Sequence, residues 1–131
     1  MRCPRIRFVS LALCTAVATT VPTALAAPPA VTCEPGGRAY APPGGFWGPD
    51  SVSGCHVLGS PGVTEDIVWQ TVDADAESPV CVQAFSYQDQ KWHFLGCGSS
   101  GEGVIPWGNV VGSPKIRAGS ALTGTFVTWT Y

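Results

Sequence analysis

Hydrophobic and polar positions alternate over residues 80–97, in two runs that flank a short polar turn. Both runs are rich in aromatic and β-branched residues, which is typical of a β-hairpin. A three-residue loop over residues 88–90 aligns Cys81 directly with Cys97. Facing Cβ atoms lie about 4.5–5.5 Å apart in antiparallel strands, and a slight twist closes this distance to the roughly 3.5–4.5 Å of a disulfide. The pattern therefore predicts an antiparallel hairpin bridged by Cys81 and Cys97.

The same register assigns the hairpin side chains to two faces. The face expected to join the core holds Val80, Val82, Ala84, Trp92 and Phe94. The other face is mixed enough to meet solvent or a partner, and holds Cys81, Gln83, Phe85, Tyr87, Lys91, His93, Leu95 and Cys97.

Several further short runs predict strands. Residues 66–72 and 121–131 alternate cleanly, residues 115–118 form a short strand, and residues 104–111 are interrupted by Pro106, which favours an edge or bulged strand. The glycine-rich residues 99–103 are expected to be a turn. Short strands separated by Gly/Pro turns, without helical periodicity, indicate an all-β fold: a small antiparallel β-sandwich or barrel stapled by two disulfides.

Residues 1–26 have the pattern of a signal peptide. Three arginines precede an uncharged apolar run, and Ala24-Leu25-Ala26 is a small-x-small cleavage site. We expect a mature chain that begins at Ala27 and is secreted into the extracellular space.

Four cysteines remain after the leader: Cys33, Cys55, Cys81 and Cys97. An even set in an exported chain predicts two disulfides, for which three connectivities exist. The hairpin register favours Cys81–Cys97 and leaves Cys33 to pair with Cys55. Zinc sites use closely spaced cysteine pairs, and the sequence has none, so no metal is predicted.

The charge balance narrows the class of partner. Three of the seven basic residues lie in the leader, so the mature chain carries four against nine acidic residues, a net charge of −5. A negative chain is unsuited to nucleic acid or to an anionic membrane surface. Another secreted protein is the expected partner.

Residues 27–50 are dominated by proline and glycine, which do not support a helix or a central strand. We predict an N-terminal arm over 27–50 and an antiparallel β domain over 51–131. The arm either covers the core with its aromatic rings or docks on a partner, since such anchors dominate interface energies. Its candidate contact residues are Arg38, Tyr40, Phe46 and Trp47.

Five tryptophans are distributed over the mature chain. Small β domains fill their cores with aromatic side chains, which is the expectation for most of them. Trp47 and Trp107 each lie in a Gly/Pro context and are the candidates for exposed anchors. Trp107 therefore joins the predicted partner-binding residues.

The chain offers little for catalysis. His56 and His93 are its histidines, no G-x-S-x-G motif is present, and the mature cysteines are expected to be oxidised. Asp73, Asp75 and Glu77 alternate with alanine and would point the same way in an extended chain, but they lack the glycine-containing loop of a calcium motif. We predict a protein that is not an enzyme and uses no cofactor or metal.

The stretch V-T-C-E-P-G-G at residues 31–37 is similar to the T-C-x-P-G stretch of the subtilisin inhibitors of Streptomyces. The cysteine separations of 22 and 16 residues depart from that family, and the strand expected before Cys33 is missing. The overall plan, a leader, two disulfides and a Gly/Pro-rich arm, resembles small secreted proteins of actinobacteria. It also resembles the adaptor subunits of umbrella-shaped toxin particles, whose N-terminal arm enters a cleft on a lectin.

This resemblance implies an adaptor that links components of a secreted toxin–lectin complex. Two alternatives remain open. A protease inhibitor would present Arg38 or Tyr40 within the Cys33–Cys55 loop, and a carbohydrate-binding module would use exposed tryptophans.

Overall fold

The computed structural model describes residues 33–73 and 79–131. The predicted signal peptide, the beginning of the predicted arm, and Asp75 and Glu77 lie outside these residues. The described chain belongs to the compact unit Val31–Tyr131 and contains no helix.

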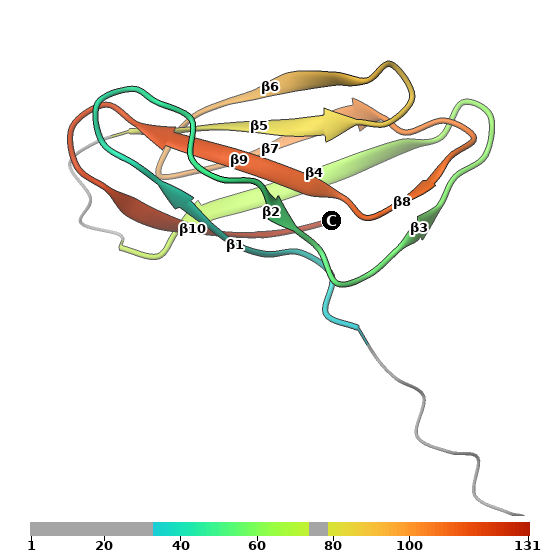
Figure 1. The fold of residues 1–131 in the computed structure, drawn as a ribbon, viewed down its shortest axis with the longest axis horizontal. Coiled ribbons are helices and arrows are strands. Elements are labelled where there is room, and N and C mark those ends of the chain that lie inside the picture. The colour runs from blue at the N-terminus through green and yellow to red at the C-terminus, as the bar shows by residue number, and fades with distance from the viewer. Residues whose placement is uncertain (1–32, 74–78) are drawn as a thin grey trace, which may run out of the picture. The chain divides into compact units, whose positions relative to one another are not determined.

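The described residues form ten strands. They are β1 (Gly37–Ala41), β2 (Ser51–Val52), β3 (Val57–Leu58), β4 (Thr64–Thr71), β5 (Val80–Ser86), β6 (Lys91–Gly98), β7 (Ser100–Pro106), β8 (Val111–Gly112), β9 (Lys115–Ser120) and β10 (Thr125–Thr130). Two four-stranded sheets have the orders β1-β10-β4-β7, here sheet A, and β2-β9-β5-β6, here sheet B (Figure 1). Strands β3 and β8 form a small third sheet, and all pairings are antiparallel.

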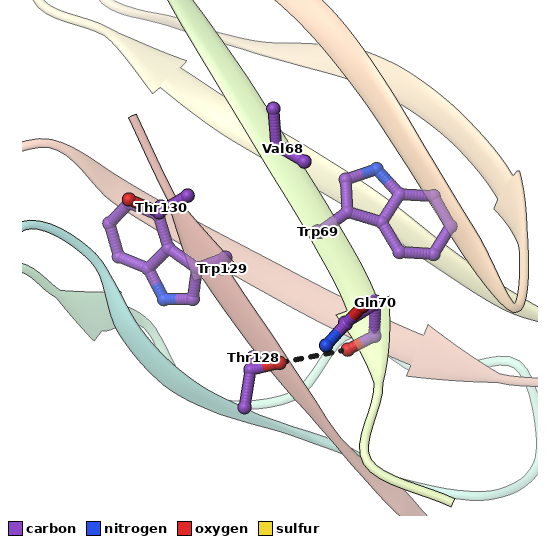
Figure 2. A pocket seen from close by; sticks show the side chains of 6 residues that line it. All are labelled: Val68, Trp69, Gln70, Thr128, Trp129 and Thr130. Atoms are coloured by element: carbon purple, nitrogen blue, oxygen red, sulfur yellow. Dashed lines mark hydrogen bonds between the residues drawn. The ribbon is translucent and has the colours of Figure 1, made fainter. Parts of the chain in front are cut away.

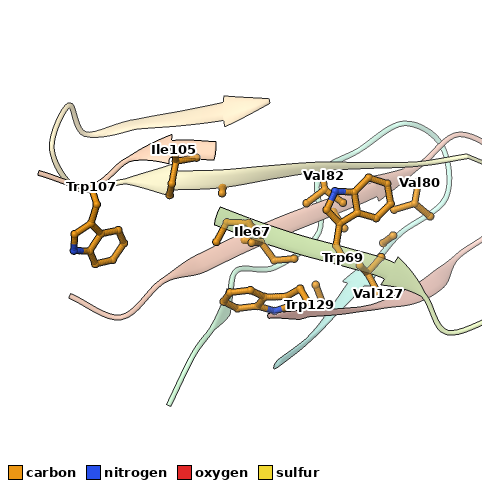
Figure 3. Packing of buried hydrophobic residues seen from close by; sticks show 13 residues of the cluster. Ile67, Trp69, Val80, Val82, Ile105, Trp107, Val127 and Trp129 are labelled. Carbon is orange, nitrogen blue, oxygen red and sulfur yellow. The ribbon is translucent and has the colours of Figure 1, made fainter. Parts of the chain in front are cut away.

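Sheets A and B enclose one hydrophobic core, so the predicted all-β fold with two disulfides is confirmed. Along β4 and β10 alternate residues are buried, as the sequence pattern predicts. The buried apolar side chains of both sheets form one cluster (Figure 3). Its largest members are Ile67, Trp69, Ile105, Trp107, Val127 and Trp129, together with Val80, Val82 and Ile116. At about 25 cal/mol per Å² of buried apolar surface, three buried indoles account for a large share of the stability of so small a core.

The segment 27–50 differs from the expected arm, because residues 37–41 are a strand of sheet A. Strand β1 pairs with β10 and lies at the sheet edge, where flanking proline and glycine cause no loss of ladder hydrogen bonds. Its alanines Ala39 and Ala41 are buried. Gly36 precedes it with φ 93°, and a Cβ there would lie 1.9 Å from the Trp129 carbonyl oxygen. The composition that suggested an irregular arm therefore permits close docking of this strand.

The hairpin register is partly confirmed. Cys81 faces Cys97, but the pairing shifts between Val82 and Gln83, which leaves Leu95 as an extra residue in β6. Such a bulge reverses the faces of the residues beyond it, and Gly96, at φ 129°, provides the backbone freedom it needs. The loop becomes four residues long, from Tyr87 to Gln90.

The bulge makes the predicted core positions of Trp92 and Phe94 wrong. Trp92 lies opposite Phe85, with their ring centroids 5.3 Å apart. Phe94 is 60% exposed, whereas Leu95 packs against the core.

The predicted turn over residues 99–103 is also wrong, since β7 begins at Ser100. Its glycines meet bulky neighbours: a Cβ on Gly101 would lie 2.7 Å from the Trp69 ring, and one on Gly103 2.7 Å from Leu95. Glycine here serves close packing. Strand β7 lies at the edge of sheet A, as the sequence predicts for this segment, but it ends at Pro106 and does not continue to residue 111.

Both predicted disulfides are present. Cys33–Cys55 ties the residues before β1 to the loop after β2, and Cys81–Cys97 crosses between β5 and β6. The two bridges close loops with sequence separations of 22 and 16 residues.

We predict that replacing Cys33 and Cys55 together by serine lowers the free energy of unfolding by about 3 kcal/mol, because the unfolded chain regains the entropy of an open loop. Urea denaturation followed by tryptophan fluorescence measures the change. The Cys81→Ser, Cys97→Ser pair is the matched control and should lose a similar amount. A loss below about 1 kcal/mol for Cys33 and Cys55 would contradict a stabilising role of that bridge.

Candidate functional site

A small pocket opens where loops from several strands meet at one end of the domain. Figure 1 shows the β1–β2 connection and the β9–β10 turn at the same end as the beginning of β5 and the end of β6. The pocket, here the aromatic pocket, has a volume of about 180 Å³ and is lined by Gly45, Trp47, Cys81, Phe94, Gly119, Ser120 and Ala121.

The β1–β2 connection, residues 42–50, is fastened to β9 backbone to backbone. The amide of Gly45 donates to the Ser120 carbonyl at 2.8 Å, and that of Gly48 donates to the Ala118 carbonyl at 2.8 Å. A Cβ on Gly119 would lie 2.5 Å from the Phe46 carbonyl oxygen, so this approach requires glycine. The connection therefore runs along the β9 edge and carries Trp47 to the outer face of sheet B.

The floor of the pocket follows from strand register. Cys81 pairs with Gly119 on one side and with Cys97 on the other. The Phe46 backbone takes the place that a Gly119 side chain would need. The recess lies beside this crossing, with Trp47 and Phe94 among the residues that line it. The pocket thus combines the close approach at Gly119 with two aromatic side chains, Trp47 from the β1–β2 connection and Phe94 from β6.

Two cations and three aromatic rings extend from the pocket over the outer face of sheet B. The Arg117 guanidinium lies 4.3 Å from the centroid of the Trp92 ring and 5.3 Å from that of Trp47. The Lys115 ammonium lies 4.4 Å from the Phe85 ring centroid and 5.4 Å from that of Trp92. These five residues are here the cation–aromatic stack.

Polar contacts fix the two cations of the stack. Arg117 Nε donates to Gln83 Oε1 at 2.8 Å, and Lys115 Nζ lies 3.2 Å from the Asp50 carboxylate. Each cation–π contact contributes about 0.5–1 kcal/mol at a partly exposed site. The Arg117 contact therefore favours the orientation of Trp47 beside the pocket.

A second aromatic cluster occupies the outer face of sheet A. The Arg38 guanidinium lies 4.9 Å from the Phe126 ring centroid, and the Tyr40 and Phe126 centroids are 5.2 Å apart. Tyr40 faces Phe126 in the β1–β10 ladder. We call these three residues the sheet A cluster.

The structure thus separates the residues predicted to bind a partner. Trp47, 37% exposed, lines the pocket, and Phe46, 72% exposed, precedes it on the same loop. Arg38 and Tyr40 belong to the sheet A cluster on the opposite outer face.

The expectation that Trp107 is exposed is wrong. Its side chain is 0% exposed, and its Nε1 donates to the Val110 carbonyl at 3.2 Å. A Cβ on Gly59 would lie 2.7 Å from the ring, so that the glycine lets the chain close over the indole.

Sequence reasoning missed Arg117, Lys115 and the outward position of Phe94. The alternation of K-I-R-A-G in β9 could have predicted that Lys115 and Arg117 lie on the same face of the strand. The position of Phe94 had no such signal, since it depends on the bulge in β6.

The two histidines, His56 and His93, form side-chain contacts near the surface. His93 Nε2 lies 2.7 Å from Asp89 Oδ2. Desolvation opposes ionisation of Asp89, but hydrogen bonds from His93, Ser86 and the Lys91 amide, with the His93 charge, outweigh it and lower the pKa of this carboxyl. The His56 Nδ1 atom lies 2.9 Å from Ser113 Oγ, on an exposed imidazole.

Within residues 33–73 and 79–131, no group of three or more acidic, histidine or cysteine side chains is arranged to hold a metal ion. The predicted absence of enzymatic activity and of a cofactor stays a prediction.

Two larger grooves lie on sheet A. One of about 300 Å³ runs between β4 and β10, and Figure 2 shows its lining: Val68, Trp69, Gln70, Thr128, Trp129 and Thr130. Both indoles of this groove are buried, so mainly threonine, glutamine and valine side chains reach solvent, and Thr128 Oγ1 donates to the Gln70 carbonyl at 3.4 Å. The other, of about 570 Å³, borders Asp66 and Glu102. Neither exposes an aromatic anchor among its lining residues.

No protein-family model, curated protein or solved structure matches the chain. The two disulfides fit an extracellular protein. In the part of the chain that the structure describes, no helix is long and apolar enough to cross a membrane.

The contrast between Trp107 and Phe46 yields a prediction. Trp107→Ala should lower the free energy of unfolding by about 3–5 kcal/mol, because it empties a buried site. Phe46→Ala, at an exposed position, should change it by less than about 0.5 kcal/mol. Chemical denaturation of both variants measures this, and comparable losses for the two would contradict the assigned burial.

Proposed function

We propose that this chain is a secreted, non-catalytic module that binds another protein through the aromatic pocket and the cation–aromatic stack. The observation that carries the proposal is the pocket itself: an apolar recess bordered by Trp47 and Phe94 on an otherwise ordinary sheet surface. Exposed aromatic side chains beside a recess are the usual anchors of protein interfaces.

The size of the pocket favours a protein side chain as its occupant. Sites for small-molecule ligands measure about 300–1,000 Å³, whereas a cavity of about 150 Å³ accommodates benzene. A volume of about 180 Å³ therefore suits one aromatic ring or one branched aliphatic side chain. Such an anchor, fully buried, contributes about 2 kcal/mol or more to binding.

The sheet A cluster supports the finer proposal of an adaptor. An adaptor must hold two partners at once, which requires two separate surfaces. Trp47 and Arg117 lie on the outer face of sheet B, whereas Arg38, Tyr40 and Phe126 lie on the outer face of sheet A. This arrangement would allow the chain to link a lectin and a toxin component, the role that the sequence resemblance implies.

The two alternative functions receive less support from the geometry. Sugar rings stack on open indole faces, but Trp47 and Trp92 each have the Arg117 guanidinium against the ring. A protease inhibitor presents its scissile-like residue on a projecting loop, whereas Arg38 and Tyr40 are paired within β1 to Thr128 and Phe126.

Affinity capture from the culture supernatant of the secreting organism tests the proposal. The wild-type chain should retain partner proteins, and Trp47→Ala should reduce the recovery of one of them by about 30-fold, the effect expected for a hot-spot residue. Phe126→Ala should leave that protein bound and reduce a different one. Quantitative mass spectrometry of the retained proteins measures both effects.

Leu58→Ala is the matched control, because Leu58 is an exposed apolar residue in β3, outside the pocket lining and the sheet A cluster. It should retain every protein that the wild type retains. Undiminished recovery of all proteins by Trp47→Ala, with its fold intact by circular dichroism, would refute binding through the pocket.

A further inference from the structure

We propose that the partner presents an extended segment with an apolar side chain for the aromatic pocket and, two residues away, a carboxylate for Arg117. This inference rests on the proposed function, since it specifies the chemistry of the partner at the same site. It adds a charged recognition element that the pocket alone does not require.

Arg117 has hydrogen-bond donors that its contacts within the described chain do not use. A guanidinium carries five N–H donors, and within the described residues its one side-chain hydrogen bond is from Nε to Gln83. The indoles of Trp47 and Trp92 lie against it, which leaves the edge with the two Nη groups for a ligand. That edge matches the two oxygens of a carboxylate.

Lys115 is less suited to this role. Its ammonium already lies 3.2 Å from the Asp50 carboxylate. Arg117 forms no ion pair with an acidic residue in the described part of the chain. Arg117, which is closer to the pocket along β9 than Lys115, is therefore the cation available to pair with a carboxylate of the partner.

Strand geometry sets the spacing between the two contacts. Arg117 and Gly119 lie two residues apart on β9 and face the same side of sheet B, as do Gln83 and Cys81 on β5. The corresponding rise is about 6.8 Å. An extended partner segment has the same repeat, so side chains at its positions i and i+2 would reach the pocket and the guanidinium together.

The net charge of the chain makes such a contact selective. The expected mature chain carries four basic against nine acidic residues, a net charge of −5. Against this net negative charge, a carboxylate on the partner is attracted where Arg117 offers donors beyond the Nε that bonds Gln83. Charge complementarity of this kind mainly selects the partner and its register.

Selection from a random heptapeptide library displayed on phage, with the wild-type chain immobilised, tests the inference. The enriched sequences should carry Leu, Ile, Phe or Trp two positions from Asp or Glu. A synthetic peptide of the enriched sequence then enters a double-mutant cycle. Replacing the acidic residue of the peptide by the corresponding amide should weaken binding by about 10- to 100-fold, and Arg117→Gln should have the same effect. The two changes together should lower the affinity no further than either change alone.

Lys91→Gln is the matched control, because it removes a cation at the far end of the hairpin, next to the turn that ends at Gln90. It should leave peptide affinity within about twofold of wild type. Enriched peptides without an acidic residue, or a cycle in which Arg117→Gln weakens the acid and amide peptides equally, would overturn the carboxylate contact and leave the pocket in place. Enriched peptides that bind the Trp47→Ala variant as tightly as the wild type would overturn the proposed docking site itself.

Discussion

The backbone hydrogen bonds between residues 42–50 and β9 are the constraint on which the candidate site depends. Because of these bonds, the chain passes from sheet A to sheet B in contact with the end of β9. Gly48 and Gly119 permit this close approach, since neither has a Cβ. Trp47 thereby lies beside Arg117, and the recess lies next to the point where the Phe46 backbone crosses Gly119. The pocket, the stack and the proposed partner chemistry all follow from this one crossing.

The remainder of the domain supports this crossing from below. Buried indoles fill the space between the sheets, and the Cys81–Cys97 bridge fixes the strands beneath the pocket. Preformed aromatic surfaces lose little side-chain entropy on binding. A domain with so small a core can therefore present a defined binding surface on a short, proline-rich connection.

The sequence predicted the features that depend on local pattern. Alternation located β4 and β10, and the facing positions of Cys81 and Cys97 predicted their bridge. The bulge at Leu95 was not predictable, because a single extra residue leaves no mark in the alternation yet reverses the face of Trp92. The glycines at 101 and 103 suggested a turn because glycine-rich composition is typical of turns. In the structure they make room for Trp69 and Leu95, which is a requirement of tertiary packing that composition does not reveal. Trp47, which lines the pocket, was a candidate from its Gly/Pro context in the sequence, whereas the contacts of Arg117 come from residues distant in sequence.

Fluorine NMR of the chain labelled with 5-fluorotryptophan tests the central claim most directly, because each of the five indoles gives its own resonance. When the captured partner is added, the resonances of Trp47 and Trp92 should shift, while those of the buried Trp69, Trp107 and Trp129 should stay within their line widths. Assignment follows from single Trp→Phe variants. A bound complex in which the Trp47 resonance does not move would contradict docking at the aromatic pocket.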